Sequence, residues 1–177
     1  KVDWNLPRST WRLIVDGMQE PRVFMAIVGI SWFWAIGATY LSQFPEIILS
    51  IWQAQQSVFT LFLTIFSLGI GVGSMLCNRL LKGEVKATLV PIAMIGMTVS
   101  MFGFYGFSLP YTAQPHEAGT LVSIGELFLH SGIWPWLAVV SLFFTSVFGG
   151  IYIVPLYAIM QHYAPKGKVA SSIACNN

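Results

Sequence analysis

Four long stretches of this chain contain no Asp, Glu, Lys or Arg, and they limit the folds open to it more than any other feature. They run over residues 23–45, 47–78, 87–115 and 127–165. A helix needs about 20 apolar residues to cross the roughly 30 Å hydrocarbon layer of a bilayer. Each stretch can hold one such helix, so we predict an all-α, polytopic membrane bundle with about four transmembrane helices.

We place the four spans at residues 23–43, 57–77, 87–109 and 136–160, inside a membrane domain of residues 23–169. Pro45 and Glu46 are expected to end the first span. The polar segments 52–57 and 130–135 are typical of membrane interfaces, and residues 119–129 of the long loop before the fourth span are expected to form a short interfacial helix.

Residues 1–22 form a linker before the first span. Trp11, Ile14, Val15 and Met18 recur there at helical spacing, which is typical of an amphipathic helix lying on a membrane surface. A linker that is helical only through packing is the alternative. The last eight residues, 170–177, have the pattern of a further span that has just begun, so we expect the chain to be a piece of a longer protein.

The basic residues predict an orientation. All nine Lys and Arg residues lie before the first span, between the second and third, or after the fourth. Basic loops of membrane proteins remain in the cytoplasm, so both ends of the chain are predicted to be cytoplasmic. The formal charge of +2 is spread over these loops rather than gathered in one patch, which argues against nucleic-acid binding and leaves the lipid bilayer as the expected partner.

Catalytic and metal-binding patterns are missing from the sequence. No charged residue falls in the middle of a span, where such groups mark ion or proton routes. His116, His130 and His162 map to different places along the predicted topology, and nucleotide-binding and nucleophile motifs are absent. We therefore expect no active site, metal or cofactor here, and we interpret Cys77 and Cys175 as packing residues.

Uncharged polar and aromatic side chains within the spans are the candidate functional residues. A face of the first span, together with the fourth span, is predicted to form a wall of a substrate cavity; the alternative is that the hydroxyl groups bond to carbonyls of their own helices. Glycines are expected where helices pack closely, with helix sliding as a second role. The candidates are Ser31, Trp34, Thr39, Ser42, Gln43, Thr145 and Tyr152 for the cavity, Gly69, Gly71, Gly73, Gly149 and Gly150 for packing, and Asn78, Arg79 and Gly83 for a tight cytoplasmic turn.

Residues 29–45 carry a resemblance to a known family through the sequence GISWFWAIGATYLSQFP. This segment resembles the seventh span of the major facilitator superfamily branch that includes bacterial lysophospholipid transporters. Residues 71–83, 149–161 and 168–177 resemble, in order, the turn after span eight, span ten and the start of span eleven. The turn departs from the family pattern, because Asn78 replaces its Asp and a single Arg replaces several, which puts a charge-relay role of this loop in doubt.

The resemblance implies a fragment covering spans seven to ten of a twelve-span carrier in a bacterial inner membrane. Its implied substrate is a lysophospholipid, and its implied partners are the remaining spans of the full-length chain. Some family members are fused to an acyltransferase and an acyl-carrier-protein ligase, so a role as the membrane domain of such an enzyme stays open. So does a four-span scaffold without catalytic activity.

Overall fold

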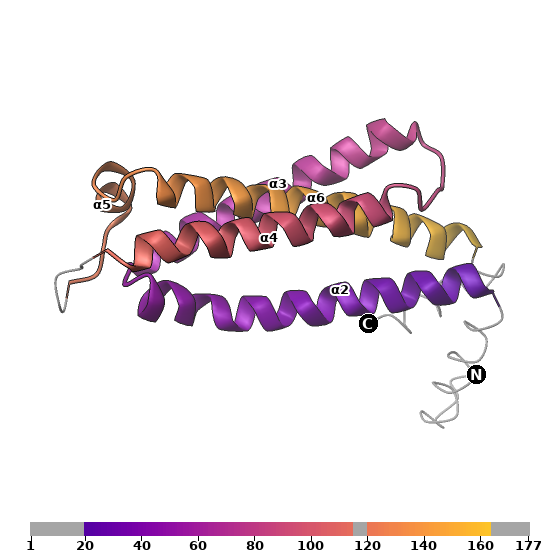
Figure 1. The fold of residues 1–177 in the computed structure, drawn as a ribbon. Helices are drawn as coiled ribbons and strands as arrows, with labels where there is room; N and C mark the ends of the chain where they lie inside the picture. The colour runs from indigo at the N-terminus through magenta and orange to yellow at the C-terminus, as the bar shows by residue number, and fades with distance from the viewer. Residues whose placement is uncertain (1–19, 115–119, 164–177) are drawn as a thin grey trace, which may run out of the picture.

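The computed structural model describes residues 20–114 and 120–163 of the chain, and these residues form a bundle of helices (Figure 1). In chain order they are α2 (Pro21–Glu46), the π-helical turn η1 (Ile47–Ile51), α3 (Gln56–Leu81), α4 (Val90–Thr112), α5 (Ile124–Leu129) and α6 (Trp134–Tyr163). Residues 1–19 of the linker predicted at residues 1–22, with Trp11, Ile14, Val15 and Met18 of its amphipathic helix, lie outside the described residues. So does the further span predicted at residues 170–177.

Four of these helical segments are long and apolar enough to cross a membrane, which confirms the predicted fold class. They are Pro21–Ile51, Gln56–Leu81, Val90–Thr112 and Trp134–Tyr163. The first span was predicted to end at Pro45 and Glu46. Helix α2 ends at Glu46, and the unpredicted π-helical turn η1 continues the helical segment to Ile51. Phe44 and Ile48 are buried around this junction.

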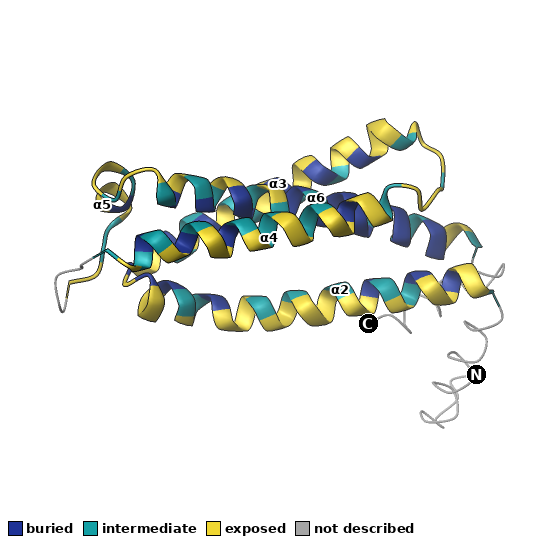
Figure 2. Ribbon diagram, viewed as in Figure 1, coloured by how far each residue is buried: buried dark blue, intermediate teal, exposed yellow. Residues whose placement is uncertain are grey.

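Helix α6 lies at the centre of the bundle. The other three long helices pack mainly on α6 rather than on one another. Buried residues therefore occur all round α6, whereas α2 and α4 show a broad exposed face (Figure 2). A helix that is apolar on every side is typical of a position enclosed by other helices.

Helices α3 and α6 approach each other through small residues. A Cβ atom added to Gly73 would collide with the backbone of Val147, and one added to Gly150 would lie 2.5 Å from the carbonyl oxygen of Ile70. Gly69 faces Ser146 in the same way. Lipid supplies no hydrophobic force between helices, so close backbone contact at small residues is a main source of their association.

The other two glycines predicted for packing differ from these. Nothing lies within 4 Å of a Cβ built on Gly71, so the packing role predicted for Gly71 finds no partner among the described residues. At Gly149 the nearest atoms belong to the Phe33 ring of α2, at an ordinary contact distance of 3.5 Å. The closest helix contact thus depends on Gly69, Gly73 and Gly150.

Pro155 interrupts the hydrogen bonding of α6, and α3 compensates for it. Proline has no N–H, so the carbonyl group of Ile151, four residues earlier, loses its helical donor. The thiol of the buried Cys77 donates to this carbonyl, with 3.7 Å between Sγ and oxygen. Cys77 is therefore a packing residue that also satisfies a backbone group within the apolar core, where an unpaired carbonyl is costly.

One end of the bundle gathers the described basic residues, and we call it the basic end. It contains Arg22 at the start of α2 and Arg79, Lys82 and Lys86 around the turn between α3 and α4. Asn78 and Arg79 lie in the last turn of α3. Lys82 and Gly83 then take left-handed conformations, with φ of 51° and 78°. Gly83 thus supplies the backbone freedom predicted for this turn.

The opposite end is closed by aromatic rings, and we call it the aromatic end. The rings of Phe44, Phe62 and Phe104 bring α2, α3 and α4 together, with centroids 6.2–6.5 Å apart. The fully buried Trp52 packs on them, and the hydroxyl group of Tyr111 donates to its carbonyl oxygen at 3.0 Å. This cluster holds the helix ends to one another.

Two loops pair side by side next to the aromatic cluster. The N–H of Val122 donates to Gln53 at 2.8 Å and the N–H of Gln55 donates to Val122 at 3.0 Å, which forms an isolated parallel bridge. Helix α5 follows directly and confirms the short helix predicted in this loop. It begins with a capping box, in which Ser123 and Glu126 accept hydrogen bonds from each other's backbone N–H groups.

We predict that Gly73→Ala destabilises the bundle by about 1–3 kcal/mol, because the added methyl group forces the backbones of α3 and α6 apart. The measurement is unfolding of the detergent-solubilised protein on addition of SDS. Gly71→Ala is the matched control on the same helix and should leave stability unchanged or slightly raised. Equal losses for both variants would contradict the small-residue contact.

We also predict that the start of α5 loosens in acid. Hydrogen bonds from Ser123, chiefly from its backbone N–H, hold the pKa of the Glu126 carboxyl below its ordinary value. The cap therefore contributes fully above the unfolded pKa of Glu126 and is lost as the pH falls through the lowered folded value. Hydrogen exchange of residues 124–129, corrected for intrinsic rates, should show this loss. In Glu126→Gln the protection should not change with pH; an identical pH profile in this variant would contradict the assignment.

Candidate functional site: a cavity at the basic end

Two hydrogen bonds join α2 to α6, one to a backbone carbonyl and one between two side chains. The hydroxyl of Tyr152 donates to the carbonyl oxygen of Gly29 at 3.1 Å. The indole N–H of Trp34 donates to the hydroxyl oxygen of Tyr157, also at 3.1 Å. The ring of Phe33 stacks on Tyr152 between them, with centroids 5.6 Å apart. These contacts fix how closely α2 lies against α6.

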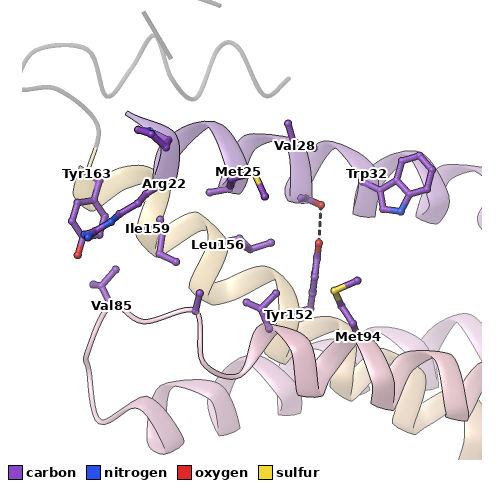
Figure 3. A pocket seen from close by; sticks show the side chains of 15 residues that line it. Arg22, Met25, Val28, Trp32, Val85, Met94, Tyr152, Leu156, Ile159 and Tyr163 are labelled. Atoms are coloured by element: carbon purple, nitrogen blue, oxygen red, sulfur yellow. Dashed lines mark hydrogen bonds between the residues drawn. The ribbon is translucent and has the colours of Figure 1, made fainter. Parts of the chain in front are cut away.

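A partly open cavity of about 720 Å³ lies beside this contact and extends to the basic end (Figure 3). Three segments form it: the first three turns of α2, the approach to α4 with the first turns of that helix, and the last turns of α6. Nearly all of its side chains are apolar. The lining residues are Pro21, Arg22, Met25, Ala26, Val28, Gly29 and Trp32 from α2, Val85, Ala87, Val90 and Met94 from the second segment, and Tyr152, Leu156, Ile159 and Tyr163 from α6.

Arg22 is the one charged residue among the described residues that line the cavity. Its guanidinium carbon lies over the ring of Tyr163, 4.9 Å from the centroid, so the side chain bridges the start of α2 and the end of α6 (Figure 3). Among the described residues, no carboxylate lies within 4 Å of the Arg22 guanidinium group. The ion pair that the described residues do form joins Lys86 to Glu84. The cavity thus combines an apolar lining with a cation at the end where α2 begins.

Sequence reasoning did not single out Arg22. Its one signal in the sequence is position, because Arg22 immediately precedes the first charge-free stretch. Its partner Tyr163 follows more than a hundred residues later, and no periodicity in the sequence links the two.

The seven predicted cavity residues do not share one location. Tyr152 lines the large cavity. Thr39 and Gln43 line a separate shallow hollow of about 390 Å³ on the exposed side of α2, together with Trp32, Ala35, Ile36 and Tyr40. Ser31 and Ser42 are exposed on α2 and line neither space, and Thr145 is half-buried in α6. The structure therefore does not bring the seven candidates together into one site.

Several of these hydroxyl groups bond to carbonyls of their own helices, which was the alternative to a substrate cavity. Thr39 donates to Ala35 at 2.9 Å, Ser42 to Thr39 at 2.8 Å and Thr145 to Ser141 at 2.9 Å, each to a carbonyl of its own helix. Such bonds satisfy the hydroxyl in an apolar setting without a ligand. Trp34 also contributes to helix docking rather than to the wall of the large cavity.

Metal chemistry has no support in the described part of the chain, where no group of three His, Cys, Asp or Glu side chains could hold an ion. The chain matches no protein-family model, no curated protein and no solved structure. The candidate site at the basic end is an apolar space whose described lining carries one cationic group, Arg22.

We predict that Tyr152→Phe weakens the docking of α2 on α6 by about 0.6–1 kcal/mol, because its hydroxyl no longer bonds to Gly29. The measurement is again unfolding in mixed detergent and SDS micelles. Tyr105→Phe removes the same atom from a side chain that is 62% exposed on α4 and should change stability little. A loss of the same size in both variants would show that the Gly29 bond contributes nothing.

Proposed function

We propose that this chain is part of an alternating-access carrier that moves lysophospholipids across or between the leaflets of a bacterial inner membrane. The observation that carries the proposal is the apolar cavity between α2, α4 and α6 at the basic end. The substrate class comes from the resemblance of residues 29–45, and the cavity has the character that such a substrate requires.

The length of the cavity along α2 fits the acyl chain of a lipid. Its lining on α2 extends from Pro21 to Trp32, which is about 16 Å at 1.5 Å per residue. Half of the roughly 30 Å hydrocarbon layer is nearly the same distance. A chain lying along α2 would therefore reach from the membrane surface to the bilayer midplane, where carriers of this kind hold their substrates.

The composition of the cavity favours an amphipathic ligand over a polar solute. A sugar or an ion would leave its polar groups without partners among Met25, Met94 and Leu156. An acyl chain gains about 0.8 kcal/mol for each CH₂ group that leaves water. The volume of about 720 Å³ also lies within the roughly 300–1,000 Å³ typical of small-ligand pockets.

The proposal includes an orientation. By the positive-inside rule, the basic end with Arg22, Arg79, Lys82 and Lys86 lies in the cytoplasm. The cavity then lies at the level of the cytoplasmic leaflet, and the aromatic end faces the other side. The remaining spans of the carrier would supply the second half, against which these helices rock.

Transport by the full-length protein tests this function. We expect Met25→Trp to reduce transport of lysophosphatidylethanolamine in reconstituted vesicles at least tenfold, because the larger ring fills the cavity. The measurement is delivery of labelled lysolipid from one leaflet to the other, followed by extraction with albumin.

Met75→Trp is the matched control. Met75 on α3 is 66% exposed, against 67% for Met25, but it lies outside the cavity. This variant should transport like the unchanged protein. If the unchanged protein moves no lysolipid, or if Met25→Trp transports as well as Met75→Trp, the proposed function is wrong.

A further inference from the structure

We propose that Arg22 is the headgroup-recognition residue of the cavity and binds the phosphodiester of a lysophospholipid whose acyl chain lies along α2 toward Trp32. The inference rests on the proposed function and adds the polarity of the ligand and the residue that selects it.

The guanidinium N–H groups of Arg22 have no carboxylate partner among the described residues. A guanidinium group has five N–H donors, and its planar fork matches the oxygens of a phosphate. The contact with Tyr163 engages the cation with a ring and supplies no oxygen acceptor. With no carboxylate within 4 Å among the described residues, these donors remain available to a ligand.

The second argument is the position of the charge relative to the apolar lining. Arg22 lies at one end of the lining, at the very start of α2, and Trp32 lies about 15 Å further along the same helix. The described positive charge of the cavity is thus confined to one end, and the apolar surface occupies the rest. A molecule with one anionic end and one long apolar chain is complementary to this arrangement, whereas a neutral lipid would leave the cation unused.

Tyr163 holds the guanidinium group of Arg22 in position. Its ring lies beneath the guanidinium and limits the positions that the long side chain adopts, so less freedom is lost when a phosphate binds. The same contact links the last turn of α6 to the first turn of α2. The headgroup would therefore bind where the two helices that enclose the acyl chain meet.

Binding to the full-length protein in nanodiscs, measured by native mass spectrometry, tests the assignment. The two probes are lysophosphatidylethanolamine and a monoacylglycerol with the same acyl chain. We expect Arg22→Gln to weaken binding of the lysophospholipid about tenfold or more, as for loss of hydrogen bonds to a charged group, and to change binding of the monoacylglycerol by less than twofold. Arg22→Lys should retain part of the preference, because it keeps the charge and loses the fork.

Arg79→Gln is the matched control, since it removes a basic residue of the same end that does not line the cavity. It should leave the affinities for both probes unchanged. The headgroup assignment is overturned if Arg22→Gln preserves the ratio of the two affinities, or if Arg79→Gln lowers that ratio equally. Because Arg22→Lys retains a cation, a folding defect confined to the Gln variant still leaves the ratio measurable in the Lys variant.

A third variant separates this inference from the proposed function. Met25→Trp should weaken binding of both probes equally, because it removes space for the chain and leaves the cation in place. If it weakens neither, the cavity is not the binding site and both proposals fail. If the Arg22 variants lose phosphate preference but the protein transports no lysolipid, the recognition role stands and the carrier function is wrong.

Discussion

The close contact between α3 and α6 is the constraint on which the rest of the bundle depends. At Gly73 and Gly150 the two backbones approach so closely that no other residue fits without a shift. This contact places Cys77 against the carbonyl that Pro155 frees, so a proline is accommodated in the most buried helix. With α6 held in this way, α2 and α4 pack on its remaining sides, and the cavity forms where α2, α6 and the approach to α4 meet.

Sequence reasoning located the spans because lipid imposes a simple requirement: a long apolar stretch whose backbone groups bond internally. The sequence alone could not show which face of each helix packs against its neighbours. Gly71 and Gly73 are two residues apart and therefore point in nearly opposite directions, and only the position of α6 shows which of them packs. The π-helical turn that follows α2 was not predicted for the same reason, since the burial of Ile48 depends on helices that are distant in sequence.

The site was harder to predict than the fold. The candidates were chosen for their polar groups, yet Thr39, Ser42 and Thr145 satisfy their hydroxyls within their own helices. The large cavity is instead lined by ordinary apolar side chains, such as Met94 and Leu156, that no pattern distinguishes from lipid-facing ones. Of the seven candidates, Tyr152 lines it. The polar feature of the cavity, Arg22 above Tyr163, joins two residues whose proximity requires the folded chain.

The central place of α6 also has a consequence for biogenesis. Helix α6 is the last of the four described long helices to leave the ribosome, yet α2, α3 and α4 find their main packing partner in it. Each of these three must therefore remain in the bilayer before that partner exists, held by its own apolarity as a separately inserted helix. The long charge-free stretches within these helices meet this need, and the bundle can be completed when its most apolar member arrives.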